Sequence, residues 1–100
     1  MFSKLKQVKD MRSQAKNMEN TLAEETVHAD VNGKVNIVMD GNQKIVSLDI
    51  DPELLNAENK ERLEKDIIEV IERAQTKVKQ MLMTKMRSGE IQMPDMSGLM

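Results

Sequence analysis

The spacing of apolar residues changes twice along this chain, and that change restricts the fold more than any other feature. From residue 2 to about residue 24 there is no Gly or Pro, and apolar residues recur every three or four positions, as on one side of a helix. Apolar and polar residues then alternate, which is the pattern of a half-buried strand. The helical spacing returns at about residue 60 and continues to about residue 88. The sequence therefore predicts an α+β domain over residues 1–88, with a sheet between two long helices.

Two turn signals divide the alternating segment into three strands. Asn32-Gly33 and Asp40-Gly41 each follow a run of alternating residues, and such pairs tolerate the positive φ of tight hairpin turns. We therefore predict a three-stranded antiparallel meander. Its main apolar positions are Val27, Ala29 and Val31, then Val35, Ile37 and Met39, then Val46, Leu48 and Ile50. Val38 and Ile45 make the second face of the sheet partly apolar.

The ends of the second helix are also marked in the sequence. Pro52 cannot donate a hydrogen bond within a central strand, so the chain is expected to leave the sheet there. Asn56 or Asn59 can cap the helix that follows. Gly89 can end it in the left-handed conformation. The remaining segment, residues 89–100, lacks periodicity and is expected to be a flexible tail.

The helices are too long for so small a sheet. At 1.5 Å per residue the last helix spans roughly 43 Å and the first roughly 33 Å, whereas a six-residue strand spans roughly 20 Å. The first part of the last helix covers the sheet, and residues 73–88 then emerge on the side from which the first helix arrives. We expect the two overhanging segments to pair as one projecting antiparallel arm.

Charge is distributed in blocks along the chain. The net charge is −2, yet residues 1–18 hold five bases and one acid, residues 19–72 hold fourteen acids and five bases, and residues 73–100 hold five bases and two acids. No acid occurs from residue 73 to residue 89, so pairing of Glu with Lys along the helix does not explain these cations. The sequence predicts a dipolar molecule with a basic arm and an acidic body.

Phosphate is the natural partner of such an arm, because neutralising DNA phosphates releases condensed counterions without reading the sequence. Duplex DNA is favoured over single strands, since the chain has one aromatic residue and cannot stack bases. The candidate DNA-binding residues are Lys4, Lys6, Lys9, Arg12, Lys16, Arg73, Lys77, Lys79, Lys85 and Arg87.

Catalysis and metal binding are disfavoured. His28 is the single histidine and has no nucleophile pattern beside it. Asp49 and Asp51 share one strand face and could hold a divalent ion, but a turn before Pro52 explains them better. Without cysteine there is no thiolate ligand. We expect no enzyme activity, cofactor, metal or small-molecule substrate. No apolar run is long enough to span a membrane, and a cytoplasmic location is expected.

An aromatic-poor core gains burial by oligomerisation. Because Val38 and Ile45 lie on the second sheet face and edge strands invite pairing, a homodimer is expected. The candidate interface residues are Val35, Ile37, Val38, Met39, Ile45 and Leu48.

The segment "VNIVMDGNQKIVSLDIDPELL", from Val35 to Leu55, resembles the YbaB/EbfC family of nucleoid-associated proteins. The segment "LEKDIIEVIERAQTK", from Leu63 to Lys77, looks like the start of that family's long last helix, and Gly89, Pro94 and Gly98 are similar to its tail. The resemblance implies a homodimer whose helical pairs project like tweezers and bind DNA with little sequence preference. It also implies a location at the nucleoid and a role in chromosome organisation and gene regulation.

Other interpretations of the basic arm stay open. A run of charge on a helix is often only a solvated surface. The arm could also belong to an adaptor that binds an acidic or helical protein partner. A peripheral membrane protein is less favoured, because the helices lack Trp or Phe anchors.

Overall fold

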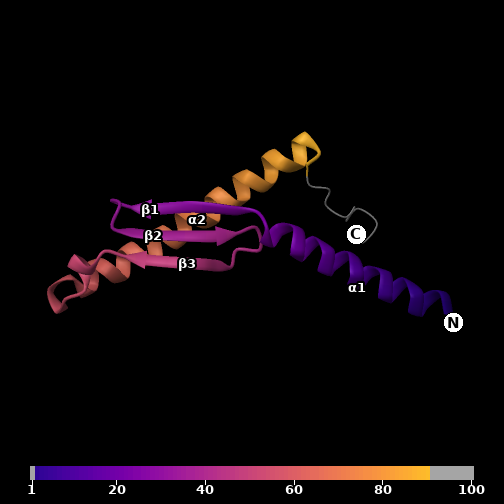
Figure 1. The fold of residues 1–100 in the computed structure, drawn as a ribbon, viewed down its shortest axis with the longest axis horizontal. Helices are drawn as coiled ribbons and strands as arrows, with labels where there is room; N and C mark the ends of the chain where they lie inside the picture. Colours follow the sequence, from indigo (N-terminus) through magenta and orange to yellow (C-terminus); the bar gives the residue numbers. More distant parts are fainter. Residues whose placement is uncertain (1, 91–100) are drawn as a thin grey trace.

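The structure is a computed structural model that describes the backbone of residues 2–90 and the side chains of residues 11–90. Its elements follow the order α1 (Phe2–Ala23), β1 (Thr26–Val31), β2 (Val35–Asp40), β3 (Ile45–Ile50), the short 3-10 turns η1 (Pro52–Leu54) and η2 (Ala57–Asn59), and α2 (Lys60–Ser88). The three strands form an antiparallel sheet in the order β1-β2-β3. The prediction of an α+β fold with a three-stranded meander and a long C-terminal helix is confirmed (Figure 1).

The register of the sheet puts the apolar strand positions on one face. Ala29 lies opposite Ile37, and Ile37 lies opposite Leu48, so these three side chains point to the same side. Between β2 and β3 the register shifts at Val38 and Met39. A bulge of this kind bends the strand and increases its twist.

The two hairpin turns use their glycines differently. In the first, Asn32 and Gly33 have φ of 55° and 70°, as the sequence predicts. In the second, the positive φ of 62° belongs to Gln43. Gly41 is required by close approach instead, because a Cβ on it would lie 2.7 Å from the carbonyl oxygen of Leu22. The turn thereby fits tightly against the last turn of α1.

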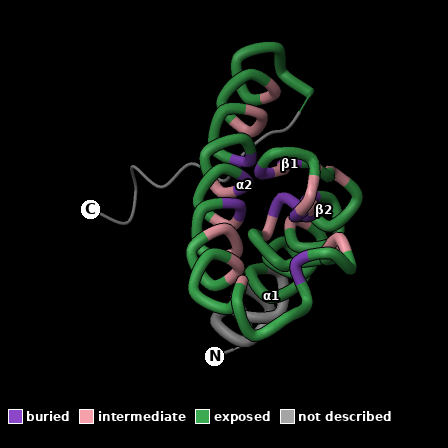
Figure 2. Tube along the Cα trace, turned by 90° about the vertical axis from the view of Figure 1, so that its left-hand side faces the viewer, coloured by how far each residue is buried: buried purple, intermediate pink, exposed green. Residues whose placement is uncertain are grey.

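The core lies between α2 and one face of the sheet. Val70, Ala74 and Val78 of α2 are fully buried, and they pack with Val35 and Ile37 of β2. Figure 2 shows the buried segments of α2 facing those of the strands. Helix α2 makes its main contacts with β1 and β2, so β3 is left at an edge that the helix does not cover.

The connection before α2 is ordered by polar caps. The Asp51 side chain accepts a hydrogen bond from the Glu53 amide at 2.9 Å, and the Asn56 side chain accepts one from the Asn59 amide at 3.0 Å. At the other end Gly89 ends α2 with φ of 79°. Beyond Glu90 the expected tail lies outside the described residues.

The expected pairing of the two overhangs into one arm is not what the structure contains. Helix α1 and the last turns of α2 leave the same end of the sheet and then diverge (Figure 1), in a molecule of 63 × 29 × 24 Å. The reason lies in their anchors. Leu22 is tied to the β2–β3 turn, where its carbonyl accepts from the Gly41 amide at 2.9 Å. Helix α2 instead packs across β1 and β2. Its last turns therefore leave the sheet near β1, whereas α1 is attached beside the β2–β3 turn.

Divergence leaves the described apolar positions of α1 largely uncovered by the other described residues. Met11 is 60% exposed and Ala15 is exposed, while Met18 is half-buried. Of the residues in α1 whose side chains are described, Leu22 alone is buried. No helix in the described chain is long and apolar enough to cross a membrane.

Candidate nucleic-acid interface

Two basic residues of α1 are open to solvent. Arg12 and Lys16 are both exposed and lie one turn apart on the helix. No ion pair or hydrogen bond joins either side chain to another described residue. The other candidates on this helix, Lys4, Lys6 and Lys9, have side chains outside the described part of the chain. Arg12 and Lys16 can therefore contact a phosphate without breaking a hydrogen bond or ion pair to another described side chain.

Lys79 and Arg87 are the basic residues of the second half of α2 that are likewise open to solvent. Both are exposed, and neither takes part in the ion pairs found within residues 11–90. They are eight residues apart, which is about 12 Å along a helix. They lie on the side of α2 that faces away from the buried Ala74 and Val78. This spacing and orientation suit contacts with the backbone of one duplex.

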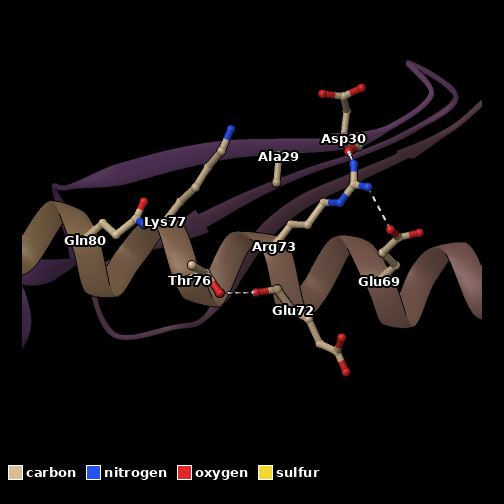
Figure 3. A pocket seen from close by; sticks show the side chains of 8 residues that line it. All are labelled: Ala29, Asp30, Glu69, Glu72, Arg73, Thr76, Lys77 and Gln80. Atoms are coloured by element: carbon tan, nitrogen blue, oxygen red, sulfur yellow. Dashed lines mark hydrogen bonds and ion pairs between the residues drawn. The ribbon is translucent and has the colours of Figure 1, made fainter.

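Arg73 and Lys77 are held at the outer edge of β1. The Arg73 guanidinium donates to the carbonyl oxygen of Asp30 at 2.9 Å and to the Glu69 carboxylate at 2.7 Å. The Lys77 ammonium donates to the carbonyl oxygen of His28 at 2.7 Å. Figure 3 shows these side chains along a shallow pocket between β1 and α2. Arg73 and Lys77 therefore already use part of their hydrogen-bonding capacity within the chain.

Lys85 forms ion pairs with two carboxylates of the chain. Its ammonium pairs with the Glu25 carboxylate, at the junction of α1 and β1, and lies 3.6 Å from a carboxylate oxygen of Glu90. The hydrogen bond that Lys85 donates to the Glu25 carboxylate, together with the negative charges of Glu25 and Glu90, raises the pKa of Lys85 above its ordinary value, although partial desolvation acts in the opposite direction. Lys85 therefore joins α2 to the base of α1.

Acidic residues gather at the opposite end of the molecule. The segment from η1 to the middle of α2 carries Glu53, Glu58, Glu61, Glu64, Asp66, Glu69 and Glu72. In Figure 1 this segment starts at the end of the sheet remote from α1 and from the C-terminal turns of α2. The carboxylates of this segment thus lie toward the other end of the long axis from the projecting helices. Glu19, Glu24 and Glu25 are exceptions, since they lie at the C-terminal end of α1 or just after it.

The expected dimer-interface residues separate into two groups. Val35, Ile37 and Met39 are at most 1% exposed beneath α2, so within this chain they are core residues and have no surface to offer. Val38 is half-buried on the other sheet face. Ile45 and Leu48 are 49% and 46% exposed. The alternation of apolar and polar residues predicts which strand residues share a face. It does not predict that α2 of the same chain covers that face.

Several exposed apolar residues were not predicted as surface features, and Val46 and Ile68 are two of them. Val46 is 59% exposed on β3 and Ile68 is 60% exposed on α2. On the same helix as Ile68, Val70 and Ala74 are fully buried. The position of α2 over β1 and β2 decides which apolar residues stay exposed. The residue pattern within a single strand or helix does not predict that position.

The residues considered for catalysis and metal binding have structural contacts. A ring nitrogen of His28, Nε2, lies 3.1 Å from the side-chain oxygen of Asn36. Asp51 caps η1. Between residues 11 and 90 no three His, Asp or Glu side chains are grouped as a metal site would need.

Comparison with known proteins agrees with this arrangement. A model of the YbaB/EbfC DNA-binding family matches residues 1–92. The nucleoid-associated proteins Teth514_0034 of Thermoanaerobacter sp. (strain X514) and Teth39_2199 of Thermoanaerobacter pseudethanolicus are 29% and 28% identical over 83 residues, which cover 82% of this chain and 75% of each relative. The crystal structure of the uncharacterized protein HP0035 from Helicobacter pylori has a TM-score of 0.58 at 19% identity, over 77% of this chain and 90% of that one. At that identity the structural match shows a shared fold.

Proposed function

This chain belongs to the YbaB/EbfC DNA-binding family, and from that premise we propose that it is a nucleoid-associated protein that binds duplex DNA as a homodimer. Its sequence preference is weak, and its roles are chromosome organisation and the regulation of genes near its binding sites. The names of its two Thermoanaerobacter relatives support the nucleoid location.

One observation carries the proposal. Among residues 11–90, five exposed cations have no ion pair or side-chain hydrogen bond to another described residue. Four of them, Arg12, Lys16, Lys79 and Arg87, belong to α1 and the C-terminal half of α2, which project from the same end of the sheet (Figure 1). The fifth, Lys65, lies among the acids of the first half of α2. The carboxylates of the first half of α2 lie toward the other end. A polyanion is therefore attracted to the projecting helices and repelled from the body.

Weak sequence preference follows from the side chains on those helices. Lys and Arg contacts with phosphate supply affinity that is the same for every sequence. Gln14 and Asn17 on α1 and Gln80 on α2 are among the few side chains that could read a base edge. Such a surface binds duplexes of many sequences with similar affinity.

Uncovered apolar surface supports the homodimer. Ile45, Val46 and Leu48 on β3 and Ile68 on α2 are each 46–60% exposed. Adjacent exposed apolar residues mark an interface more often than isolated ones. A second copy that covers them leaves α1 and the end of α2 free to meet DNA.

The test is a titration of random-sequence duplex at several salt concentrations. Log affinity of the unchanged protein should fall with log salt by about 0.9 for each phosphate contacted. The double variant Lys79→Ala/Arg87→Ala should bind more weakly and lower that slope by about 1.8, since two contacts are lost.

The control removes the same charges from the other half of α2. Arg62→Ala/Lys65→Ala should leave the affinity and the slope nearly unchanged, because these residues lie among the acids of the body. Equal losses in both variants would show that net charge alone drives binding. If the unchanged protein retains no duplex at low salt and binds a protein partner in fixed ratio, the adaptor interpretation replaces this one.

A further inference from the structure

The connection between α1 and the sheet is very short. Two residues, Glu24 and Glu25, lie between the end of α1 and the start of β1. A few residues at the end of an element are enough to absorb a large change of backbone direction. The contacts around this connection therefore decide where α1 points.

The turn between β2 and β3 holds the last turn of α1. The Gly41 amide donates to the carbonyl oxygen of Leu22 at 2.9 Å, and the side-chain amide of Asn42 donates to the carbonyl oxygen of Glu19 at 2.9 Å. The Lys44 ammonium lies 3.3 Å from a carboxylate oxygen of Glu19. These contacts attach one turn of α1 to the sheet.

Helix α2 holds the same region through the ion pair between Lys85 and Glu25. Their side chains are 25% and 29% exposed, and no other ion pair among residues 11–90 has both side chains less than one third exposed. Solvent and salt therefore screen this pair less than the others. Lys85 lies two residues before Arg87, so the pair couples the base of α1 to the part of α2 that carries exposed cations.

The rest of the described helix α1 projects from these contacts. Between residues 11 and 18 no side chain forms an ion pair or hydrogen bond with another described element. Arg12 lies ten residues before Leu22, so a change of about 20° in the direction of α1 moves it by about 5 Å. That displacement exceeds the rise of about 3.4 Å between successive phosphates of one DNA strand. The direction of α1 therefore decides which phosphates its cations reach.

We propose that the ion pair between Glu25 and Lys85, together with the β2–β3 turn, fixes the angle between α1 and the end of α2, so that the exposed cations of both helices meet the phosphates of one duplex. The proposal rests on the DNA binding of the proposed function and specifies how its two contact regions are positioned. Two contact regions held in the correct geometry lose less entropy on binding than two regions joined flexibly. Lys85 is thus a positioning residue, and not the phosphate contact that the sequence predicts.

Glu25 separates positioning from charge. Its carboxylate lies beside the projecting basic helices, so its removal should strengthen the binding of a polyanion if charge alone matters. Loss of positioning has the opposite effect. Glu25→Gln should therefore bind random-sequence duplex about threefold more weakly than the unchanged protein, with a similar salt slope because the number of phosphate contacts stays the same.

Glu24→Gln is the matched control, because it removes the same charge from the neighbouring residue. Glu24 is exposed, and its side chain forms no ion pair or hydrogen bond with another described residue. This variant should bind duplex as tightly as the unchanged protein or slightly more tightly. If Glu25→Gln binds as tightly as Glu24→Gln, the ion pair does not position the helices for DNA and the proposal is wrong.

Distances between spin labels test the angle without DNA. The chain has no cysteine, so Ser13→Cys on α1 and Thr84→Cys on α2 give two unique labelling sites, both at exposed positions. Dilution with unlabelled protein restricts the measurement to pairs within one chain. Glu25→Gln should shift or broaden the distance distribution by about 5 Å, as estimated for a helix whose direction changes at its base. An unchanged distribution would overturn the proposal.

Further variants locate the effect. Lys85→Met should change the distribution as Glu25→Gln does, and the double variant should change it no further, because both substitutions break one contact. Glu53→Gln breaks the ion pair with Lys34 at 3.7 Å, near the end of the sheet remote from α1, and should leave the distribution unchanged. A larger change in the double variant would contradict a role for the pair as one contact. If Lys85→Met fails to fold, as judged by far-ultraviolet circular dichroism, Glu25→Gln decides.

Failure of this proposal and failure of the proposed function give different results. If the unchanged protein retains no duplex at low salt, the proposed function is wrong, and the positioning of DNA contacts is overturned with it. If the unchanged protein binds duplex but the label distances do not respond to Glu25→Gln, only the positioning role is overturned.

Discussion

Helix α1 and the second half of α2, residues 73–88, have similar basic compositions and very different surroundings. The α2 segment contains the fully buried Ala74 and Val78. Three of its cations, Arg73, Lys77 and Lys85, are bonded to other parts of the chain. In the described part of α1, only Leu22 is buried, and Arg12 and Lys16 have no such contacts.

The difference shows that the number of basic residues in a segment does not measure the charge available to DNA. A cation bonded to a carbonyl or carboxylate must lose that contact before it meets a phosphate, so its net contribution is smaller. By this criterion α1 and residues 73–88 of α2 offer comparable numbers of cations that are not bonded to another described residue. Residues 73–88 of α2 contain more described basic residues, but the additional ones, Arg73, Lys77 and Lys85, form contacts that hold the fold together.

The largest expected effect tests how firmly each helix is held. Val70 on α2 is fully buried, so Val70→Ala should lower the free energy of unfolding by about 2–3 kcal/mol through lost burial and a residual cavity. Met11→Ala on α1 should change it by about 0.5 kcal/mol or less, as for an exposed residue. Urea denaturation measures both. A loss at Met11 as large as that at Val70 would show that the apolar side of α1 is covered in the assembled protein.

The anchor of α1 is the next feature to break. Gly41→Ala should lower stability by about 1–3 kcal/mol, the usual cost of forcing an extra group into a tight contact, because the new Cβ meets the Leu22 carbonyl. Thermal unfolding measures the loss. Gly33→Ala is a useful comparison, since at φ 70° its cost comes from backbone strain with no atom within 4 Å. If Gly41→Ala is neutral, the turn does not hold α1.

A smaller effect compares the two helices in DNA binding. Arg12→Ala/Lys16→Ala on α1 should lower the salt slope by about 1.8, the same as Lys79→Ala/Arg87→Ala on α2, and the four-residue variant should lower it by about 3.6. Additive losses are expected because the helices diverge and do not share a partner. A slope that the α1 pair leaves unchanged would assign DNA binding to α2 alone.

The smallest effect concerns the link between the helices at Lys85. Its pKa is raised in the folded protein, mainly by the hydrogen bond that it donates to Glu25. The link therefore stabilises the fold below the ordinary lysine pKa and is lost as the pH rises through the higher folded value. Glu25→Gln should be slightly less stable than the unchanged protein at about pH 8, and the difference should shrink toward about pH 12. A pH-independent difference would exclude titration of Lys85 as the cause.

Local pattern was sufficient for most of the fold. The alternation around Ile37 and the helical spacing around Ala74 reflect periods that depend only on strand and helix geometry. Proline and glycine marked the ends of elements, at Pro52 and Gly89. These features involve residues close together in the chain, so the sequence predicts them directly.

The candidate site depended more on long-range contacts. The sequence predicted basic residues toward one end and acids toward the other, because long helices carry their charge blocks with them. It did not predict that Lys77 reaches the carbonyl of His28, 49 positions away, or that Lys85 pairs with Glu25, 60 positions away. Those contacts depend on the path of α2 across a twisted sheet.

The sequence by itself thus determined the order of elements, the apolar side of each and the separation of charge along the chain. Only the tertiary structure decided that the two helices diverge, which cations have no bond within the described chain, and that Arg73 and Lys77 bond to carbonyl oxygens of β1. The physical reason is that periodicity sets the direction of a side chain relative to its own helix or strand. Packing between elements distant in sequence sets what that side chain meets.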